Sequence, residues 1–285
     1  MGTVFSPAYF RARRAREGEV DPLEYCGLNI AVHGPNSESW AFTEYGADSV
    51  CREPQSLQLG QSNWSWRDGA LHVDFNEETK PFFQRMPSAL SGHLRFEPGD
   101  AQGAVTQLDD EGSHYWHCIA PGGRFELNLN HPEIAVTGSG YHDANWGREG
   151  LEEGFRQWNW SRVPLQDGAA VLYDVALRSG PQKRRGWFFG RDGAVQAIEP
   201  LHTHLLQSGR WGVCRTTRSG SASTPYIKKT LVDAPFYTRS TLETELQGER
   251  RLGVHESVDL DRCCKHWVRL LLPFRMRRVG GRPWC

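Results

Sequence analysis

Residues 114–147 decide the fold; they read HYWHCIAPGGRFELNLNHPEIAVTGSGYHDANWG. Three runs of alternating side chains occupy this stretch, namely His114–Ile119, Arg124–Asn130 and Ile134–Thr137. The segments between the runs, Pro121-Gly-Gly123 and His131-Pro-Glu133, are short and contain turn residues, as hairpin connections do. The pattern therefore predicts a three-stranded antiparallel meander.

Short alternating runs also make up the rest of the chain. Leu28–Val32 and Trp40–Thr43 flank the Gly34-Pro35 turn and predict a hairpin. Further strand-like runs follow residue 150 and continue to the end of the chain. The 285 residues include 11 Trp, 30 Gly and 16 Pro but only three Met, which favours many short strands joined by turns. The predicted fold class is all-β.

The length is that of one large β domain or of two modules. The Gly147-Arg-Glu-Gly150 break lies near the middle of the chain. We therefore predict two β modules, residues 1–150 and residues 151–285, with the functional site in the first.

Charge and cysteine content narrow the class of protein. The 33 Lys and Arg nearly balance the 34 Asp and Glu, so no nucleic-acid partner is expected. The seven cysteines are odd in number and contain no Cys-x-x-Cys, so they predict neither a disulfide framework nor a zinc ribbon and favour a reducing compartment. The first residues lack a basic segment followed by an apolar stretch, so no secretory signal is expected.

One late segment bears on membranes. Trp267–Phe274 is apolar but contains Arg269 and is far shorter than the roughly 20 residues that span a bilayer. Basic clusters lie beside it, at Arg275–Arg278, and near the start of the chain, at Arg11–Arg16. Such clusters are typical of a solvated surface and also of surfaces that touch anionic lipid headgroups. The C-terminal cluster, next to apolar residues, is the better membrane candidate.

The candidate site consists of two pairs of residues. Tyr141 and Asp143 are two positions apart, and His114 and Trp116 have the same spacing upstream. In a strand, residues i and i+2 point to the same side, so one face can carry a carboxyl, a phenol, an imidazole and an indole. This set suits proton delivery to a π bond, because it holds one acid and an aromatic cation stabiliser without a paired nucleophile. Apolar surroundings would raise the pKa of Asp143 and keep it a neutral proton donor.

Each of these residues also has a purely structural interpretation. Asp143 can accept hydrogen bonds from backbone amides in the turn at Ala144-Asn145. Tyr141 and Trp116 are residue types that commonly fill a core. His114 can be a hydrogen-bonded histidine without a chemical role.

Two other functions compete with proton transfer. A metal site would use His202-x-His204, but no third ligand is identifiable and no metal-binding spacing occurs. A glycoside hydrolase needs two carboxyls, and the chain offers five spare acids near many Trp: Asp109, Asp110, Glu111, Glu152 and Glu153. Those acids lie in charge-rich, turn-like stretches that are equally typical of a solvated face.

Four segments carry a family resemblance, and they run from one end of the chain to the other. They are Val4–Tyr9, Leu28–Pro35, the stretch from His114 through Tyr141 to Trp160, and the stretch from Val258 to Met276. Together they resemble the carotenoid 1,2-hydratases, also called hydroxyneurosporene synthases, of photosynthetic bacteria. The chain departs from the family at Cys263–His266 and in the tail Gly280–Cys285, which concerns the last strand rather than the site.

The resemblance implies a lipocalin-like antiparallel β-barrel or sandwich that holds a long apolar polyene. It implies a hydro-lyase that adds water to the terminal C1=C2 double bond of acyclic carotenes of the neurosporene or lycopene type. The expected partners are the acyclic carotenoid and water, with no cofactor and no metal. The expected location is peripheral, on the cytoplasmic side of a membrane. A carrier that binds an apolar ligand without catalysis is the alternative.

The resemblance also implies residue roles. Asp143 matches the family's proposed acid, which would protonate the alkene to a tertiary carbocation, while Tyr141 would fix the carboxyl proton. Trp116 would offer its indole face to the cation, and His114 would position the water and take its proton.

The predicted meander poses a geometric difficulty for a shared site. Its first and third strands run parallel, which puts the two pairs at opposite ends, roughly 20 Å apart at about 3.3 Å per residue. Barrel shear, or a kink at Gly138 and Gly140, would be needed to bring the pairs together.

Overall fold

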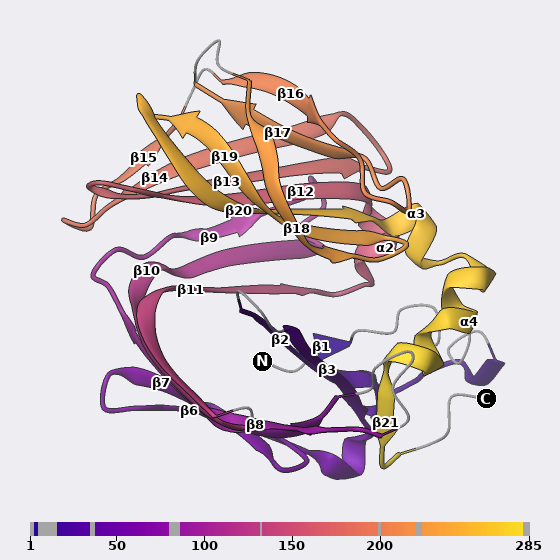
Figure 1. Cartoon of the computed structure of the whole chain (residues 1–285). Coiled ribbons are helices and arrows are strands. Elements are labelled where there is room, and N and C mark those ends of the chain that lie inside the picture. The colour runs from indigo at the N-terminus through magenta and orange to yellow at the C-terminus, as the bar shows by residue number, and fades with distance from the viewer. Residues whose placement is uncertain are drawn as a thin grey trace. The chain divides into compact units, whose positions relative to one another are not determined.

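The computed structural model describes residues 3–4, 16–34, 38–79, 86–131, 133–198, 201–220 and 224–281. The predicted features at Phe5–Tyr9, Arg11–Arg14, Pro35 and Arg282–Cys285 lie outside the described residues. The described chain consists mostly of strands, with a few short helices (Figure 1), so the all-β prediction is confirmed. Among these residues, no helix combines the length and the apolar character that a bilayer span requires.

The chain divides into two compact units that interleave in sequence. Unit 1 comprises residues 1–97, 124–139 and 265–285, and unit 2 comprises residues 98–123 and 140–264. This division differs from the predicted boundary at residue 150, because the strands near residues 114 and 147 belong to both units. The four candidate site residues, from His114 to Asp143, all belong to unit 2.

One sheet of unit 1 has the strand order β1-β2-β3-β21. Its strands are β1 (Thr3–Val4), β2 (Cys26–His33), β3 (Glu38–Tyr45) and β21 (Arg277–Val279). β2 and β3 form the predicted hairpin, in which Leu28 lies opposite Thr43. The 3₁₀ helices η1 (Pro22–Tyr25) and η2 (Ala47–Ser49) flank this sheet in sequence.

The other sheet of unit 1 contains the consecutive strands β4 to β8. These strands are β4 (Val50–Glu53), β5 (Ser56–Leu59), β6 (Ser62–Arg67), β7 (Ala70–Glu78) and β8 (Ala89–Pro98). A two-residue turn joins β6 to β7, and its residues Asp68 and Gly69 have φ of 52° and 73°. Two positive φ values characterise the type I′ turn, whose twist matches that of a hairpin.

A buried carboxylate stabilises unit 1. Glu77 of β7 is 3% exposed, and it accepts hydrogen bonds from the hydroxyls of Thr43 (2.5 Å), Tyr45 (2.7 Å) and Ser62 (2.6 Å). Because an unpaired carboxylate would be costly at such a position, these donors link strands of both sheets through one side chain.

The predicted three-stranded meander is wrong, because the chain forms one long hairpin here. β10 runs without interruption from His114 to His131, and β11 runs from Ile134 to Gly147. Pro121-Gly-Gly123 remains extended because its carbonyls find partners. Pro121 accepts from Nε of Arg162 at 2.8 Å, and Gly122 accepts from the Gly99 amide at 2.9 Å. The order β11-β10-β8 places these strands next to the sheet of β4–β8.

The main sheet of unit 2 has the order β15-β14-β13-β12-β20-β19-β18. Its strands are β12 (Phe155–Leu165), β13 (Gly168–Leu177), β14 (Gln182–Gly190), β15 (Val195–Ala197), β18 (Tyr226–Asp233), β19 (Tyr237–Leu246) and β20 (Glu249–Asp259). The shorter elements of the unit are β9 (Val105–Gln107), α2 (Leu151–Gly154), β16 (His202–Leu206), β17 (Arg215–Ser219) and α3 (Leu260–Cys263). All the pairings within the main sheet are antiparallel.

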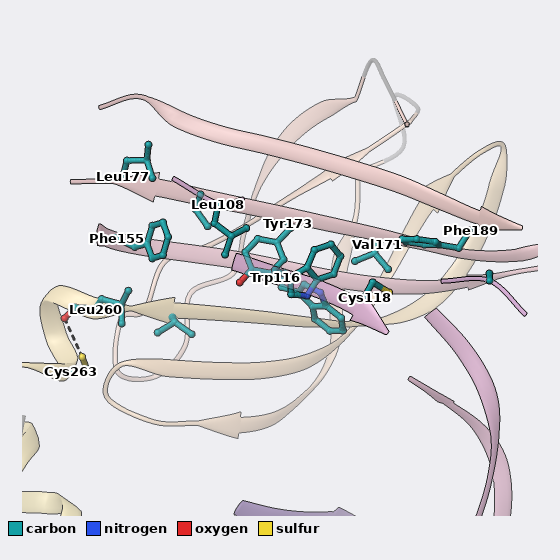
Figure 2. Close-up of a cluster of buried hydrophobic side chains, with 14 residues drawn as sticks. Leu108, Trp116, Cys118, Phe155, Val171, Tyr173, Leu177, Phe189, Leu260 and Cys263 are labelled. Atoms are coloured by element: carbon teal, nitrogen blue, oxygen red, sulfur yellow. Dashed lines mark hydrogen bonds between the residues drawn. The ribbon is translucent and has the colours of Figure 1, made fainter. Parts of the chain in front are cut away.

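The two faces of this sheet differ in chemistry. Side chains of one face join an apolar cluster that includes Trp116, Phe155 and Tyr173 (Figure 2). The opposite face carries buried polar residues that form hydrogen bonds with β17. The guanidinium of Arg218 donates two hydrogen bonds to Asp174, at 3.0 and 2.7 Å, and both side chains are at most 5% exposed.

The predicted strand character of the C-terminal segment is also wrong. Residues His266–Arg275 form the helix α4 of unit 1. Its large exposed residues Trp267, Leu270 and Phe274 are spaced by three and four positions, which is the helical period rather than the strand period.

The buried pair of unit 2 gives a stability prediction. Arg218→Ala should lower the free energy of unfolding by about 3–5 kcal/mol, because it leaves the buried Asp174 charge without a partner. Urea denaturation of the full chain measures the change. Arg250→Ala breaks the exposed ion pair with Glu243 on β19 and should change stability little. Equal effects of the two substitutions would contradict the assigned importance of the buried pair.

Candidate active site

The carboxyl of Asp143 is the centre of the candidate site. Its Oδ2 accepts a hydrogen bond from Nε1 of Trp116 at 2.8 Å and another from the hydroxyl of Tyr141 at 2.9 Å. Trp116 lies on β10 and the other two residues on β11. The antiparallel hairpin removes the expected geometric difficulty, because the start of β10 lies beside the end of β11. The amide of Arg148 there donates to the carbonyl of Ser113 at 2.9 Å.

The surroundings of Asp143 favour its neutral form. Burial raises the pKa of Asp143 above its ordinary value, against the hydrogen bonds from Trp116 and Tyr141, which stabilise the carboxylate. The charge of nearby Glu256 acts in the same direction as burial, and the charge of Arg239 opposes it. The residue as a whole nevertheless keeps partial exposure.

The two donors also determine which oxygen can carry the proton. Both bind Oδ2, so a neutral Asp143 would use Oδ2 as its carbonyl oxygen and hold the proton on Oδ1. Within the described residues, no donor reaches Oδ1, yet this atom is not among the buried atoms that lack partners. A proton on Oδ1 would therefore lie on the side of the carboxyl that is not occupied by the two donors.

Trp116 is buried and packs against two other aromatic rings. It is 1% exposed, and its ring centroid lies 5.2 Å from that of Tyr173 and 5.0 Å from that of Trp187. Figure 2 shows the indole beside Tyr173 within the buried cluster. The predicted use of the ring face therefore does not fit this arrangement, and what Trp116 presents to Asp143 is its N–H group.

Tyr141 is half-buried and contacts a second tryptophan. Its ring centroid lies 5.1 Å from that of Trp160, and the guanidinium carbon of Arg162 lies 5.8 Å from the Tyr141 ring. Burial, together with the charge of Asp143, raises the pKa of Tyr141 well above its ordinary value. Its hydroxyl therefore stays protonated and serves as a donor to Asp143.

The structure gives His114 different partners from the other three residues. Nδ1 of His114 lies 2.8 Å from Oδ2 of Asp109, Nε2 lies 3.3 Å from the carbonyl oxygen of Gly150, and the ring packs on Phe155. His114 is 1% exposed. Its predicted task of holding a water beside Asp143 is therefore not supported by its hydrogen bonds.

His114 also belongs to a group of possible metal ligands. Within the described part of the chain, ligand atoms of Asp109, His114 and Glu149 lie within 4.8 Å of one another. Both ring nitrogens of His114 already face acceptors in the protein, so a metal would have to displace one of these contacts. The pair considered from sequence, His202-x-His204, gains no third ligand, and Nε2 of His204 lies 2.9 Å from Oγ of Ser219.

Two of the spare acids of the hydrolase alternative have partners other than the Asp143 site. Asp109 is bound to His114, and Asp110 pairs with Lys183. The carboxyl that acts on Asp143 electrostatically is instead Glu256 of β20, which the sequence analysis did not single out. No motif marks Glu256, and only the strand register, in which it lies opposite Trp160 and Arg239, identifies it.

Comparison with known proteins shows to which family the chain belongs. A family profile described as "Carotenoid hydratase CrtC" matches residues 1–284. The chain belongs to the carotenoid hydratase family. As a member of this family it is an enzyme of the hydro-lyase class, as the sequence resemblance predicted.

Relatives named "Acyclic carotenoid 1,2-hydratase" match almost the whole of this chain. The protein of Thiocapsa roseopersicina is 39% identical over 99% of this chain and 68% of its own length. The protein of Rubrivivax gelatinosus is 35% identical over 98% of this chain and 68% of its own length. That of Cereibacter sphaeroides is 34% identical over 99% and 97%.

Solved structures resemble this hydratase in fold. A putative AttH from Nitrosomonas europaea superposes with a TM-score of 0.62 at 14% identity, covering 82% of this chain and 80% of that one. CghA bound to Sch210972 gives a TM-score of 0.54 at 9% identity, covering 83% and 80%. At these identities the likeness concerns the fold alone, and it confirms the predicted lipocalin-like architecture.

The raised pKa of Asp143 predicts a pH-dependent stability. Between the ordinary value of 3.8 and the raised value, the folded state binds more protons at Asp143 than the unfolded state does. The stability that this group contributes is therefore present below the ordinary pKa and is lost as the pH rises through the raised pKa. Asp143→Asn should consequently raise the free energy of unfolding at neutral pH, relative to the unsubstituted protein, and flatten its fall with pH.

Urea denaturation from acidic to neutral pH measures this effect. Asp100→Asn, at an exposed residue of the same unit, is the matched control and should leave the pH dependence unchanged. If the free energy of unfolding of Asp143→Asn has the same pH dependence as that of the unsubstituted protein, the pKa of Asp143 is not raised in the folded state.

Proposed function

We propose that this hydratase adds water to the terminal C1=C2 double bond of acyclic carotenes of the neurosporene or lycopene type, with Asp143 as the proton donor. The observation that carries the proposal is the Asp143 carboxyl, whose Oδ2 is held by Trp116 and Tyr141 while Oδ1 stays accessible. The names of the relatives, which match nearly the full chain, support the substrate class.

The first step would be proton transfer from Oδ1 of Asp143 to the less substituted carbon of the alkene. The positive charge then develops on the tertiary carbon, which is the step with the high barrier. The N–H of Trp116 and the O–H of Tyr141 would stabilise the carboxylate that remains, because hydrogen bonds to an ionised carboxylate are stronger than those to its neutral form. The hydrogen bonds from these donors would thus be stronger in the transition state than in the ground state.

The cation would be stabilised by aromatic rings other than that of Trp116. Tyr141 and Trp160 lie against one another beside Asp143, and Trp160 is 9% exposed. A ring face next to a desolvated cation contributes about 2 kcal/mol. Hydration leaves the overall oxidation state of the substrate unchanged, so the proposed reaction requires no redox cofactor.

Replacing the acid tests the reaction. Asp143→Asn should lower the rate of tertiary alcohol formation by about 10²-fold or more while carotene binding persists, because the amide keeps the shape but cannot donate an acidic proton. The measurement is incubation with an acyclic carotene in ¹⁸O-labelled water, followed by mass analysis of the product. Asp100→Asn is the matched control.

Two outcomes would contradict the proposal. If Asp143→Asn forms the labelled alcohol at the unsubstituted rate, Asp143 is not the acid. If the unsubstituted protein binds the carotene but forms no alcohol, the alternative of a lipocalin-like carrier holds.

We also propose that the protein reaches its apolar substrate as a peripheral protein on the cytoplasmic side of a membrane, with α4 as the contact. Leu270 is 70% exposed, Phe274 58% and Trp267 40%, on one stripe of this helix. Two nearby cations are engaged within unit 1: Arg277 lies 2.7 Å from Glu78, and Arg275 stacks on Trp40. Apolar insertion, rather than charge, would therefore dominate binding.

This docking mode makes a prediction for lipid vesicles. Leu270→Ser combined with Phe274→Ser should weaken vesicle binding about tenfold or more, because two apolar side chains no longer leave water. Co-sedimentation of the full chain with vesicles measures binding, and added salt should change it little. Leu205→Ser, at a residue of unit 2 that is 73% exposed, is the control. Equal binding by all variants would contradict docking through α4.

A further inference from the structure

Unit 2 contains a second carboxyl whose arrangement resembles that of Asp143. In the ion pair of Glu256 with Arg239, Nε and Nη2 of Arg239 both bind Oε1 of Glu256, at 2.8 and 2.7 Å. The contacts of Arg239 are made to Oε1, and the hydroxyl of Tyr237 also hydrogen-bonds with the Glu256 side chain. Oε2 takes no contact from Arg239 and is not among the described buried atoms that lack a partner. One oxygen is thus held by the ion pair, and the other lies outside it.

A buried donor without a partner lies next to Glu256. Trp160 is 9% exposed, and its Nε1 has no hydrogen-bond partner among the described residues. Trp160 is directly opposite Glu256 in the β12–β20 ladder, so the two side chains share one face of the sheet, with Cβ atoms about 5 Å apart. An unsatisfied buried N–H is costly, so this position favours a polar molecule that can accept its hydrogen bond.

These groups are connected to the acid. The ring of Trp160 packs on Tyr141, whose hydroxyl binds Asp143, and the charge of Glu256 acts on the Asp143 carboxyl. Burial alone would lower the pKa of Arg239, but the adjacent Glu256 charge raises it above the ordinary value, so the guanidinium stays charged. A carboxyl with a raised pKa and an ion-paired carboxylate thus lie within electrostatic range of each other.

We propose that Glu256 is the base of the hydration: its Oε2 and the N–H of Trp160 hold the attacking water, and Oε2 takes the proton of that water. This inference rests on the proposed function, because it assigns the second half of the same reaction. It also replaces His114, whose ring nitrogens face Asp109 and Gly150, in the role of the base.

The proposed step balances in atoms and electrons. The proton on Oδ1 of Asp143 forms the new C–H bond with the π electrons of the alkene. A lone pair of the water forms the C–O bond to the tertiary carbon, and one water proton moves to Oε2 of Glu256. The sum is one alkene and one water giving one tertiary alcohol. Asp143 is then ionised and Glu256 protonated, and exchange with solvent restores both.

Reactions in D₂O can separate the base from the acid. Glu256→Gln should lower kcat for alcohol formation by about 10²-fold, within the range for general base catalysis, with KM changed less than about threefold. Deuterium should still enter the recovered carotene, because Asp143 continues to protonate the alkene and the uncaptured cation loses a proton again. Asp143→Asn should give neither alcohol nor deuterium.

Two further variants test the chemical assignment. Formate should restore part of the alcohol formation in Glu256→Ala, because a small carboxylate can replace the missing base. Trp160→Phe should lower kcat about tenfold, because it removes the N–H and keeps an aromatic ring. The matched control is Glu243→Gln, which removes a partly exposed, arginine-paired carboxylate from the same β19–β20 hairpin and should leave the rates unchanged.

The outcomes distinguish this inference from the proposed function. If the unsubstituted protein makes no alcohol, the proposed function fails. If that protein is active but Glu256→Gln keeps its full rate, the inference alone is overturned. Loss of alcohol and deuterium together in Glu256→Gln, or loss of activity in Glu256→Ala that formate does not restore, would equally overturn it, because Glu256 would then act by tuning Asp143 or by holding the fold.

Discussion

The hydrogen bonds from Trp116 and Tyr141 to a single oxygen of Asp143 are the interaction on which the site depends. They fix the carboxyl within mostly apolar surroundings and would stabilise the anion that the proposed proton transfer leaves. Burial opposes them and raises the pKa of Asp143, which favours the protonated form. Burial thus favours a bound proton on this carboxyl, while the two hydrogen bonds favour its anion.

The main sheet of unit 2 supports this site by giving its two faces different tasks. The apolar face packs on Trp116 and provides the aromatic surroundings of Asp143. The opposite face carries buried polar residues beside a smaller apolar cluster. β17 is attached to it through the Arg218–Asp174 pair and through the amide of Thr216, which donates to Asn159. The aromatic face also carries the Glu256–Arg239 ion pair, so the surroundings of Asp143 are mostly but not wholly apolar.

Sequence patterns predicted local features well and chain connections less well. Alternation predicted the β2–β3 hairpin and placed Tyr141 and Asp143 on one side of a strand, because strand geometry fixes that relation locally. The Pro121-Gly-Gly123 stretch has the composition of a turn, but partners from distant segments keep it extended. In α4 the exposed apolar residues have helical spacing, but adjacent apolar residues obscure this period in the sequence.

The sequence by itself determined the all-β class, the family and the identity of the candidate acid, because these follow from composition, alternation and short local matches. Only the tertiary structure decided the partners of that acid. Trp116 uses its N–H rather than its ring face, and His114 bonds to Asp109, since contacts across strands depend on register and rotamer rather than on spacing along the chain. Glu256 and Trp160 became neighbours through register alone, because residues nearly a hundred positions apart have no shared pattern in the sequence.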